Sequence, residues 1–165
     1  MEFIGAKESD FPIIYNMMVK AREKADQEGI HQWNENYPTK EMIMRDILGE
    51  DTYLVYEEGN IKGFFITNSV CEDDVHGHIK WMYPQSRFLI LHRLCVDPSI
   101  QDQGIGQRIL RKYEERAVEA GYESVRIDVF GTNNRAIHIY EKFGYKRMGR
   151  AVCDRGEFFI YEKHL

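Results

Sequence analysis

Apolar residues recur at helical spacing in two segments near the start of the chain. The first segment follows a cap at Ser9 or Asp10 and stops near Gly29, as glycine favours helix ends. Its apolar face consists of Ile13, Ile14, Met17, Met18, Ala21 and Ala25. The second segment is capped by Thr39. Its apolar face consists of Ile43, Met44, Ile47 and Leu48. A short strand at residues 2–7 precedes both predicted helices.

Runs of β-branched, aromatic and alternating residues predict strands in the rest of the chain. A hairpin turn at Glu58-Gly59-Asn60 joins the first two of these strands. The runs cover residues 52–56, 61–67, 88 to the break at Pro98, 125–129, 145–152 and 157–162. Two more helices are predicted, one from Ile105 to near Gly121 and one after Asn133. No periodic pattern covers residues 68–87.

The order of these elements predicts the fold class. Strands and helices follow one another as β-α-α-β-β-β-α-β-α-β-β, which is typical of an α/β domain with a mixed sheet (α+β). At 165 residues the chain has the length of a single domain, so we expect one domain over residues 1–165.

Composition and charge exclude several classes of function. A net charge of −5 argues against a nucleic-acid partner, and the apolar runs fall short of the roughly 20 residues that span a membrane. The N-terminus lacks the basic region and apolar core of a secretory signal. Three widely spaced cysteines form no CxxC pair, which suits a reducing compartment. We therefore expect a cytoplasmic protein.

The stretch from Phe88 to Gly106 predicts a buried strand, a break at Pro98 and a glycine loop that opens a helix. Backbone N–H groups at such a helix start form an anion site, typically for phosphate. A dinucleotide fold requires a third glycine where this chain has Ile109. A Walker loop requires a lysine after Gly106, where this chain has Gln107.

The loop contains Gln101-x-x-Gly104-x-Gly106, which resembles the Q/R-x-x-G-x-G/A signature of the GNAT superfamily of N-acetyltransferases. The segment from Asn133 to Tyr145 resembles the N-x-x-A-x-x-x-Y-x-x-x-G-F/Y segment of the same family. The resemblance covers about residues 88–150. It implies a GNAT-like fold of about seven strands and about four helices, with a splayed central strand pair.

The resemblance implies that acetyl-coenzyme A (acetyl-CoA) is the cosubstrate and coenzyme A the product. Its pyrophosphate would bind the N–H groups of the loop, formed by Gln101, Asp102, Gln103, Gly104, Ile105, Gly106 and Gln107. Its pantetheine arm would pair with the backbone of Leu94, Cys95 and Val96. Further cofactor contacts are implied for Asn133, Ala136 and Tyr140. A helix N-cap is an alternative, compatible role for Asn133.

Two residues are candidates for proton transfer. By resemblance, Tyr140 protonates the departing thiolate, whereas periodicity alone would make it a core aromatic. His92 is a candidate general base or water relay. A structural role, with the amine deprotonated through a water chain, is the alternative for His92. Ile90 stands where some family members carry a catalytic glutamate.

Trp33, Glu35 and Asp128 are predicted to hold a cationic acceptor. The alternative is that Trp33 and Tyr37 only pin their loop. The run from Glu72 to His78 contains acidic and histidine residues, but it lacks a diagnostic metal-ligand spacing and we expect it to be solvated, so no metal is predicted.

The resemblance therefore implies an N-acetyltransferase that moves an acetyl group from acetyl-CoA to a primary amine by direct attack in a ternary complex. A small-molecule amine is the favoured acceptor. A protein or peptide N-acetyltransferase and a non-catalytic acyl-CoA sensor are the alternatives. The family resemblance also allows a homodimer.

Overall fold

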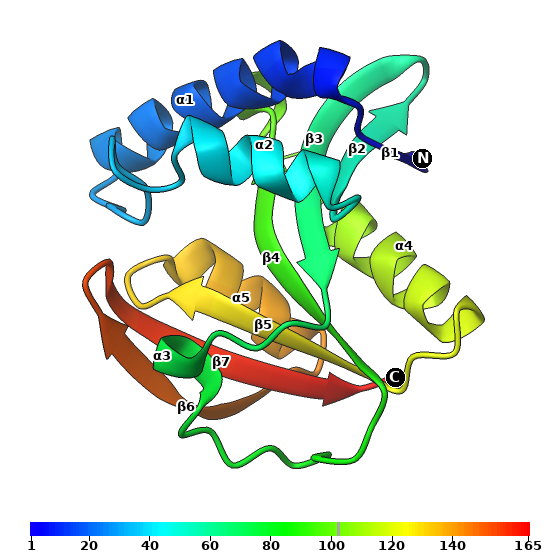
Figure 1. Ribbon diagram of the computed structural model, residues 1–165, viewed down its shortest axis with the longest axis vertical. Coiled ribbons are helices and arrows are strands. Elements are labelled where there is room, and N and C mark those ends of the chain that lie inside the picture. The colour runs from blue at the N-terminus through cyan, green and yellow to red at the C-terminus, as the bar shows by residue number, and fades with distance from the viewer. Residues whose placement is uncertain (102) are drawn as a thin grey trace. The chain divides into compact units, whose positions relative to one another are not determined.

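A computed structural model describes residues 1–101 and 103–165. The helices and strands in chain order are β1 Glu2–Gly5, α1 Phe11–Gln27, α2 Lys40–Leu48, β2 Thr52–Glu57, β3 Asn60–Asn68, α3 Asp73–His76, β4 Phe88–Val96, α4 Ile105–Glu119, β5 Ser124–Phe130, α5 Asn134–Lys142, β6 Lys146–Cys153 and β7 Gly156–His164 (Figure 1). Short 3-10 turns, η1 and η2, cover Glu8–Asp10 and Pro98–Ile100.

The chain forms two compact units. The first unit comprises Met1–Thr67 and Arg93–Lys112, and the second comprises Asn68–His92 and Tyr113–Leu165. Strand β4 contributes its first half to the second unit and its second half to the first. That the whole chain is one domain stays a prediction.

The strands are hydrogen-bonded in the order β1-β2-β3-β4-β5-β7-β6, which confirms the predicted mixed sheet of seven strands. In the second unit β4 pairs with β5 in parallel from Phe88↔Ser124 to Leu91↔Ile127, and the other pairings of β5 and β6 with β7 are antiparallel. The parallel pairing thus covers only the first part of β4, although β4 itself continues to Val96. The parallel pairing therefore ends just before Leu94 to Val96, the residues where β4 was predicted to splay from the next strand.

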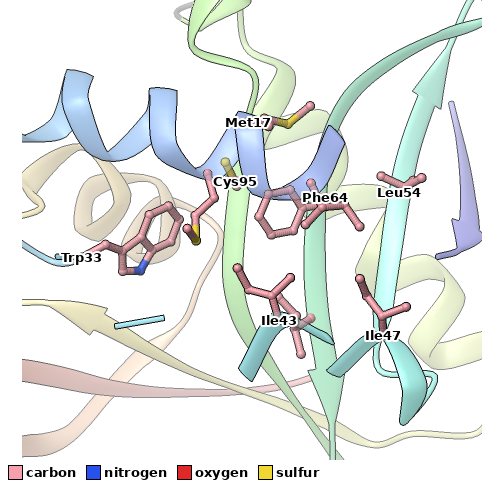
Figure 2. Close-up of a cluster of buried hydrophobic side chains, with 10 residues drawn as sticks. Met17, Trp33, Ile43, Ile47, Leu54, Phe64 and Cys95 are labelled. Atoms are coloured by element: carbon pink, nitrogen blue, oxygen red, sulfur yellow. The ribbon is translucent and has the colours of Figure 1, made fainter. Parts of the chain in front are cut away.

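The core of the first unit is a cluster of apolar side chains from both long helices and three strands (Figure 2). α1 and α2 lie side by side in Figure 1 and direct one face each toward it. Its buried members are Ile14, Met17, Met18, Trp33, Ile43, Ile47, Leu54, Phe64, Ile66 and Cys95. Two residues predicted on these faces are instead exposed: Ile13 by 42% and Leu48 by 59%. Each lies at the edge of its stripe, where the helix turns toward solvent.

Two of the three helix caps predicted from the sequence form hydrogen bonds to their own helix, whereas Asp10, the N-cap of α1, accepts no N–H group of α1 and instead accepts that of Lys7 at 2.8 Å. The Thr39 hydroxyl accepts the N–H of Met42 at 3.2 Å, and the Asn133 amide oxygen accepts the N–H of Ala136 at 3.2 Å. Each cap satisfies a helix N–H group that has no partner inside the helix. The predicted apolar face of α4 is also buried, and it consists of Ile105, Ile109, Leu110, Tyr113 and Ala117.

The segment of residues 68–87, where no element was predicted, contains the short helix α3. The expectation of a solvated segment is wrong at Val75 and His76, which are buried. The segment is tied to the sheet by Glu162 of β7, whose carboxylate accepts the N–H of Met82 at 2.8 Å and of Tyr83 at 3.1 Å. These contacts join residues about 80 positions apart, so no local pattern could indicate them.

Gly63 of β3 lies so close to β4 that it has no room for a side chain. A Cβ atom at this position would lie 2.3 Å from the carbonyl oxygen of Cys95. Gly63→Ala is therefore expected to lower the free energy of unfolding by about 1–3 kcal/mol, because the backbone of one strand must shift.

Urea unfolding of Gly63→Ala beside Gly5→Ala tests this expectation. A Cβ atom at Gly5, on β1, would meet nothing within 4 Å, so this control should unfold like the wild type. Equal stability of the two variants would show that β3 and β4 accommodate the methyl group.

No helix in the described part of the chain is both long and apolar enough to cross a lipid bilayer.

Candidate functional site

The predicted anion site in the first unit is a turn that leads into a long helix. After β4 the Asp97 carboxylate accepts the N–H of Ser99 at 2.9 Å and so shapes η2. Gly104 has a φ of +69°, a left-handed conformation that glycine adopts without strain, and α4 begins at Ile105. The turn thus ends at the positive end of a 15-residue helix, where an anion is favoured. Asp102, predicted to bind the cofactor, lies outside the described residues.

The guanidinium of Arg108 braces this turn. It donates to the carbonyl oxygen of Gln103 at 3.0 Å and to the carboxylate of Glu57 at 2.8 Å. The hydrogen bond from Arg108 lowers the pKa of the Glu57 carboxyl group, so the ion pair persists to a lower pH than an ordinary glutamate would allow. Sequence analysis did not identify this brace, because Glu57 is 51 positions away in the chain.

The part of β4 predicted to pair with the pantetheine arm, Leu94 to Val96, follows a backbone irregularity. Arg93, just before it, has a φ of +31°, which is unusual for a residue with a side chain. The Cys95 thiol is buried, and burial raises its pKa far above the ordinary value. Cys95 is therefore protonated at neutral pH and is unsuited to act as a nucleophile.

The loop that carries Trp33 and Glu35 is fixed from two sides within the first unit. Trp33 lies in the apolar cluster and is only 8% exposed. The guanidinium of Arg93 donates to the Tyr37 hydroxyl at 2.9 Å and pairs with Asp46 of α2. These contacts give Trp33 and Tyr37 the pinning role that was the alternative interpretation. Glu35 is exposed. An acceptor-binding role for Trp33 and Glu35 stays a prediction.

The second unit brings together three ionisable residues from different elements. Asp128 of β5 lies between His76, the last residue of α3, and His92 of β4. The Oδ1 atom of Asp128 is 3.7 Å from Nε2 of His76 and 3.9 Å from Nδ1 of His92. His92 and Asp128 were each predicted as site residues from the sequence, whereas His76 was not.

Burial and charge act against each other on Asp128. Burial raises the pKa of its carboxyl group, but donation from His76 and the charges of His92 and Arg155 lower that pKa by a larger amount. The net pKa is below the usual value, so Asp128 is ionised at neutral pH. The cluster therefore holds a stable negative charge beside two groups that can carry protons.

Tyr140, the predicted acid, is the buried residue of α5. Burial and then the negative charge of Asp128 raise the pKa of its hydroxyl group well above the usual value. The hydroxyl group thus keeps its proton throughout the physiological pH range. Its ring packs edge-on against that of Tyr145 at 5.9 Å. Ala136, on the first turn of the same helix, is partly exposed.

The donor set of the cluster does not suit a metal ion. A histidine that ligates a metal normally donates its other ring N–H to a neighbour. Nδ1 of His76 instead accepts the backbone N–H of Glu72 at 2.9 Å, which keeps the proton on Nε2, the atom that faces Asp128. No group of three or more His, Cys, Asp or Glu positioned to hold a metal occurs among residues 1–101 and 103–165.

Comparison with protein families gives one match that spans most of the chain. The model of the Acetyltransferase (GNAT) family matches residues 16–145. This range includes the glycine loop of the first unit and His76, His92, Asp128 and Tyr140 of the second.

Individual relatives match over shorter segments. Thialysine N-epsilon-acetyltransferase of Bos taurus is 31% identical over 67 residues, which are 41% of this chain and 39% of that protein. The uncharacterized N-acetyltransferase YdgE of Bacillus subtilis (strain 168) is 30% identical over 82 residues, 44% of this chain and 52% of that protein. The chain thus spans no more than about half the length of the curated relatives it matches.

Solved structures agree with the fold over nearly the whole chain. A GNAT family acetyltransferase from Streptococcus agalactiae 2603 has a TM-score of 0.87 at 24% identity, with 99% of this chain and 95% of that chain covered. The PaiA N-acetyltransferase of Thermoplasma acidophilum, solved in complex with coenzyme A, has a TM-score of 0.71 at 18% identity, with 99% and 98% covered. At these identities the likeness establishes the fold.

Proposed function

Because the chain belongs to the acetyltransferase (GNAT) family, we propose that it transfers the acetyl group of acetyl-CoA directly to a primary amine. The observation that carries this proposal is the glycine turn at the start of α4, which lies within the family match. Its left-handed Gly104 and the N-terminus of the helix suit the pyrophosphate of coenzyme A. A structural relative was solved with coenzyme A bound, which supports the same ligand here.

The proposed cofactor contacts are those that the family resemblance implies for these residues. Gln101, Gln103, Gly104, Ile105, Gly106 and Gln107 supply the loop N–H groups, and Asp102 would do the same. Ile105 is buried, so it contributes its backbone alone. The backbone of Leu94, Cys95 and Val96 pairs with the amides of the pantetheine arm. Asn133 and Ala136 contact the cofactor from the start of α5, where Asn133 also serves as the cap.

The reaction is a direct acyl transfer. The amine nitrogen attacks the thioester carbonyl carbon, and a backbone N–H of β4 stabilises the oxyanion. As the C–S bond breaks, Tyr140 gives its proton to the thiolate of coenzyme A, and the second proton that the attacking nitrogen loses on becoming an amide restores the Tyr140 hydroxyl group. The proton lost by the ammonium group goes to His92, directly or through water. The buried, protonated Cys95 gives no support to an acyl-enzyme intermediate.

We propose a small-molecule amine as the acceptor. The relative named for thialysine acetylation supports this choice because thialysine is a free amino acid with a side-chain amine. Ionised Asp128 suits a cationic acceptor, with Trp33 and Glu35 as the further candidates. The three cysteines, none of them in a disulfide in the described part of the chain, suit a cytoplasmic location.

A matched pair of loop variants tests the proposed cofactor site. Asparagine and aspartate both tolerate a left-handed backbone, and a side chain at Gly104 enters open space. Gly104→Asp adds a negative charge that Gly104→Asn lacks. We expect Gly104→Asp to bind coenzyme A at least about tenfold more weakly than Gly104→Asn in isothermal titration calorimetry, because the charge repels the pyrophosphate.

The same proteins are also assayed for turnover. The rate of coenzyme A release is measured with thialysine and with an alanine-terminated peptide as the acceptor. Faster release with thialysine is the expected result, and faster release with the peptide would favour a protein acceptor. Tight binding of acetyl-CoA without turnover of any amine would favour a non-catalytic sensor. Equal affinities of the two Gly104 variants for coenzyme A would contradict the proposed pyrophosphate site.

A further inference from the structure

His76 is the one buried member of the His76–Asp128–His92 cluster that the proposed mechanism leaves without a role. It ends the short helix α3 and is 3% exposed. The backbone N–H of Glu72 donates to its Nδ1 at 2.9 Å. The proton of the neutral ring is therefore on Nε2, directed at Asp128 Oδ1 at 3.7 Å. Such contacts in a free enzyme often shorten when substrate binds.

The contacts of α3 hold His76 in this orientation. The side chain of Glu72 pairs with Arg155 of the turn between β6 and β7 at 3.2 Å, while its backbone fixes the His76 ring. The ring of His76 also packs near that of Trp81, with the centroids 6.0 Å apart. The imidazole thus has a fixed tautomer and a fixed direction.

His92 is oriented with its other nitrogen toward the same carboxylate. The N–H of Val70 donates to Oδ1 of Asn68 at 3.0 Å, which identifies that oxygen as an acceptor. Nε2 of His92, 3.1 Å from the same oxygen, then donates to it. Nδ1 of His92 faces Asp128 and is the position at which this ring takes up a further proton.

The two faces of the Asp128 carboxyl group differ. Its Oδ1 atom is buried between the two imidazoles, whereas the side chain as a whole is 17% exposed. This Oδ1 atom and Nε2 of His76 face each other at 3.7 Å, and neither atom has a hydrogen-bond partner among the described residues. The exposed remainder of the carboxyl group can therefore meet a cation while the buried oxygen faces the two imidazoles.

We propose that His76 is a positioning residue for the acceptor amine: its Nε2–H group holds the Asp128 carboxylate in place, and that carboxylate binds the ammonium group beside Nδ1 of His92. This inference rests on the proposed acetyl transfer and names the part of the chain that orients the acceptor. The proton leaves the ammonium nitrogen for His92 Nδ1, and the neutral amine then attacks the thioester.

Two substitutions at His76 separate this role from a purely structural one. The amide oxygen of asparagine can replace Nδ1 and accept the Glu72 N–H, but it leaves Asp128 without a donor. The amide nitrogen of glutamine can replace Nε2 and donate to Asp128, but it leaves the Glu72 N–H without its acceptor. A positioning role predicts that His76→Gln keeps more activity than His76→Asn. A structural role predicts the reverse order.

We expect His76→Asn to raise the KM for the acceptor, thialysine in the first instance, about tenfold, with the KM for acetyl-CoA unchanged. The acid limb of the kcat/KM profile should move to higher pH. The donation from His76 lowers the pKa of Asp128, so its loss lets the carboxylate take up a proton at a higher pH. The other charged or titratable groups that act on Asp128 are His92 of β4, Arg155 of the β6–β7 turn and Tyr140 of α5, and all are unchanged in both variants.

A measurement on the wild-type protein does not depend on turnover. Nitrogen-15 spectra of the imidazoles should show His76 as the Nε2–H tautomer, the form that can donate to Asp128, and this measurement needs neither variant to fold. An Nδ1–H tautomer, or equal acceptor KM values and pH profiles for both variants of an active enzyme, would overturn the inference alone. Absence of turnover by the wild type with every amine would overturn the proposed function, and the inference with it.

Discussion

Replacing Tyr140 by phenylalanine is expected to lower kcat about a hundredfold, the smaller end of what a general acid contributes. The departing thiolate of coenzyme A would then have to take its proton from water. Burial and the charge of Asp128 raise the pKa of the Tyr140 hydroxyl group well above its usual value, so the wild-type residue carries its proton at all physiological pH values. The KM values should change little, because the ring and its packing remain.

Tyr145→Phe is the matched control for Tyr140→Phe. The two rings are in contact, and the Tyr145 hydroxyl group is also buried, beside the Glu114 carboxyl group. Its removal should leave kcat and stability near the wild-type values. Initial rates of coenzyme A release at saturating substrate give kcat for both variants. A wild-type kcat for Tyr140→Phe would mean that Tyr140 is only a core aromatic.

Glu162→Gln is expected to lower the free energy of unfolding by about 3 kcal/mol, the cost of breaking a buried ion pair. The Glu162 carboxylate is buried, accepts Nε of Arg126 at 3.1 Å and binds two backbone N–H groups of the 68–87 segment. The guanidinium of Arg126 is enclosed by the rings of Trp81 and Phe88, at 3.9 and 3.6 Å from their centres. Without its counter-charge Arg126 would be a buried, unpaired cation.

Glu157→Gln gives the corresponding measurement for an exposed ion pair on the same strand. Glu157 pairs with Arg150 at 3.0 Å, but both side chains are exposed to solvent. Such pairs contribute at most about 1 kcal/mol, so this variant should unfold close to the wild type in urea. Comparable losses in the two variants would contradict a special role for the buried pair. Hydrogen exchange at Met82 and Tyr83 should also accelerate in Glu162→Gln alone.

Most of the fold could be predicted because its signals are local. The caps at Thr39 and Asn133 and the left-handed Gly104 each depend on a few neighbouring residues. The apolar stripes of α1, α2 and α4 depend on apolar residues that recur every three or four positions along the chain. The prediction of burial was wrong at the edges of the stripes, such as Leu48, because exposure there depends on what packs against the helix.

The residues of the candidate site also divide into those that local sequence motifs predict and those that only tertiary packing reveals. The glycine turn and the Asn133 to Tyr145 segment are contiguous motifs, so the family resemblance could be found without coordinates. His76 could not be found, because its helix has four residues and its burial depends on strands far along the chain. Trp33 is similar: the sequence places it in a loop, and packing places it in a core.

By itself the sequence determined the class of fold and the order of its elements, and it predicted an anion site in the strand, loop and helix from Phe88 onward. Only the tertiary structure decided that Asp128 lies between His76 and His92, and that Arg126 on the same strand is paired with Glu162. The physical reason is range. Backbone conformation and helix capping are set by neighbours in the chain, whereas the charge state of a carboxylate is set by burial and by partners that only folding brings near.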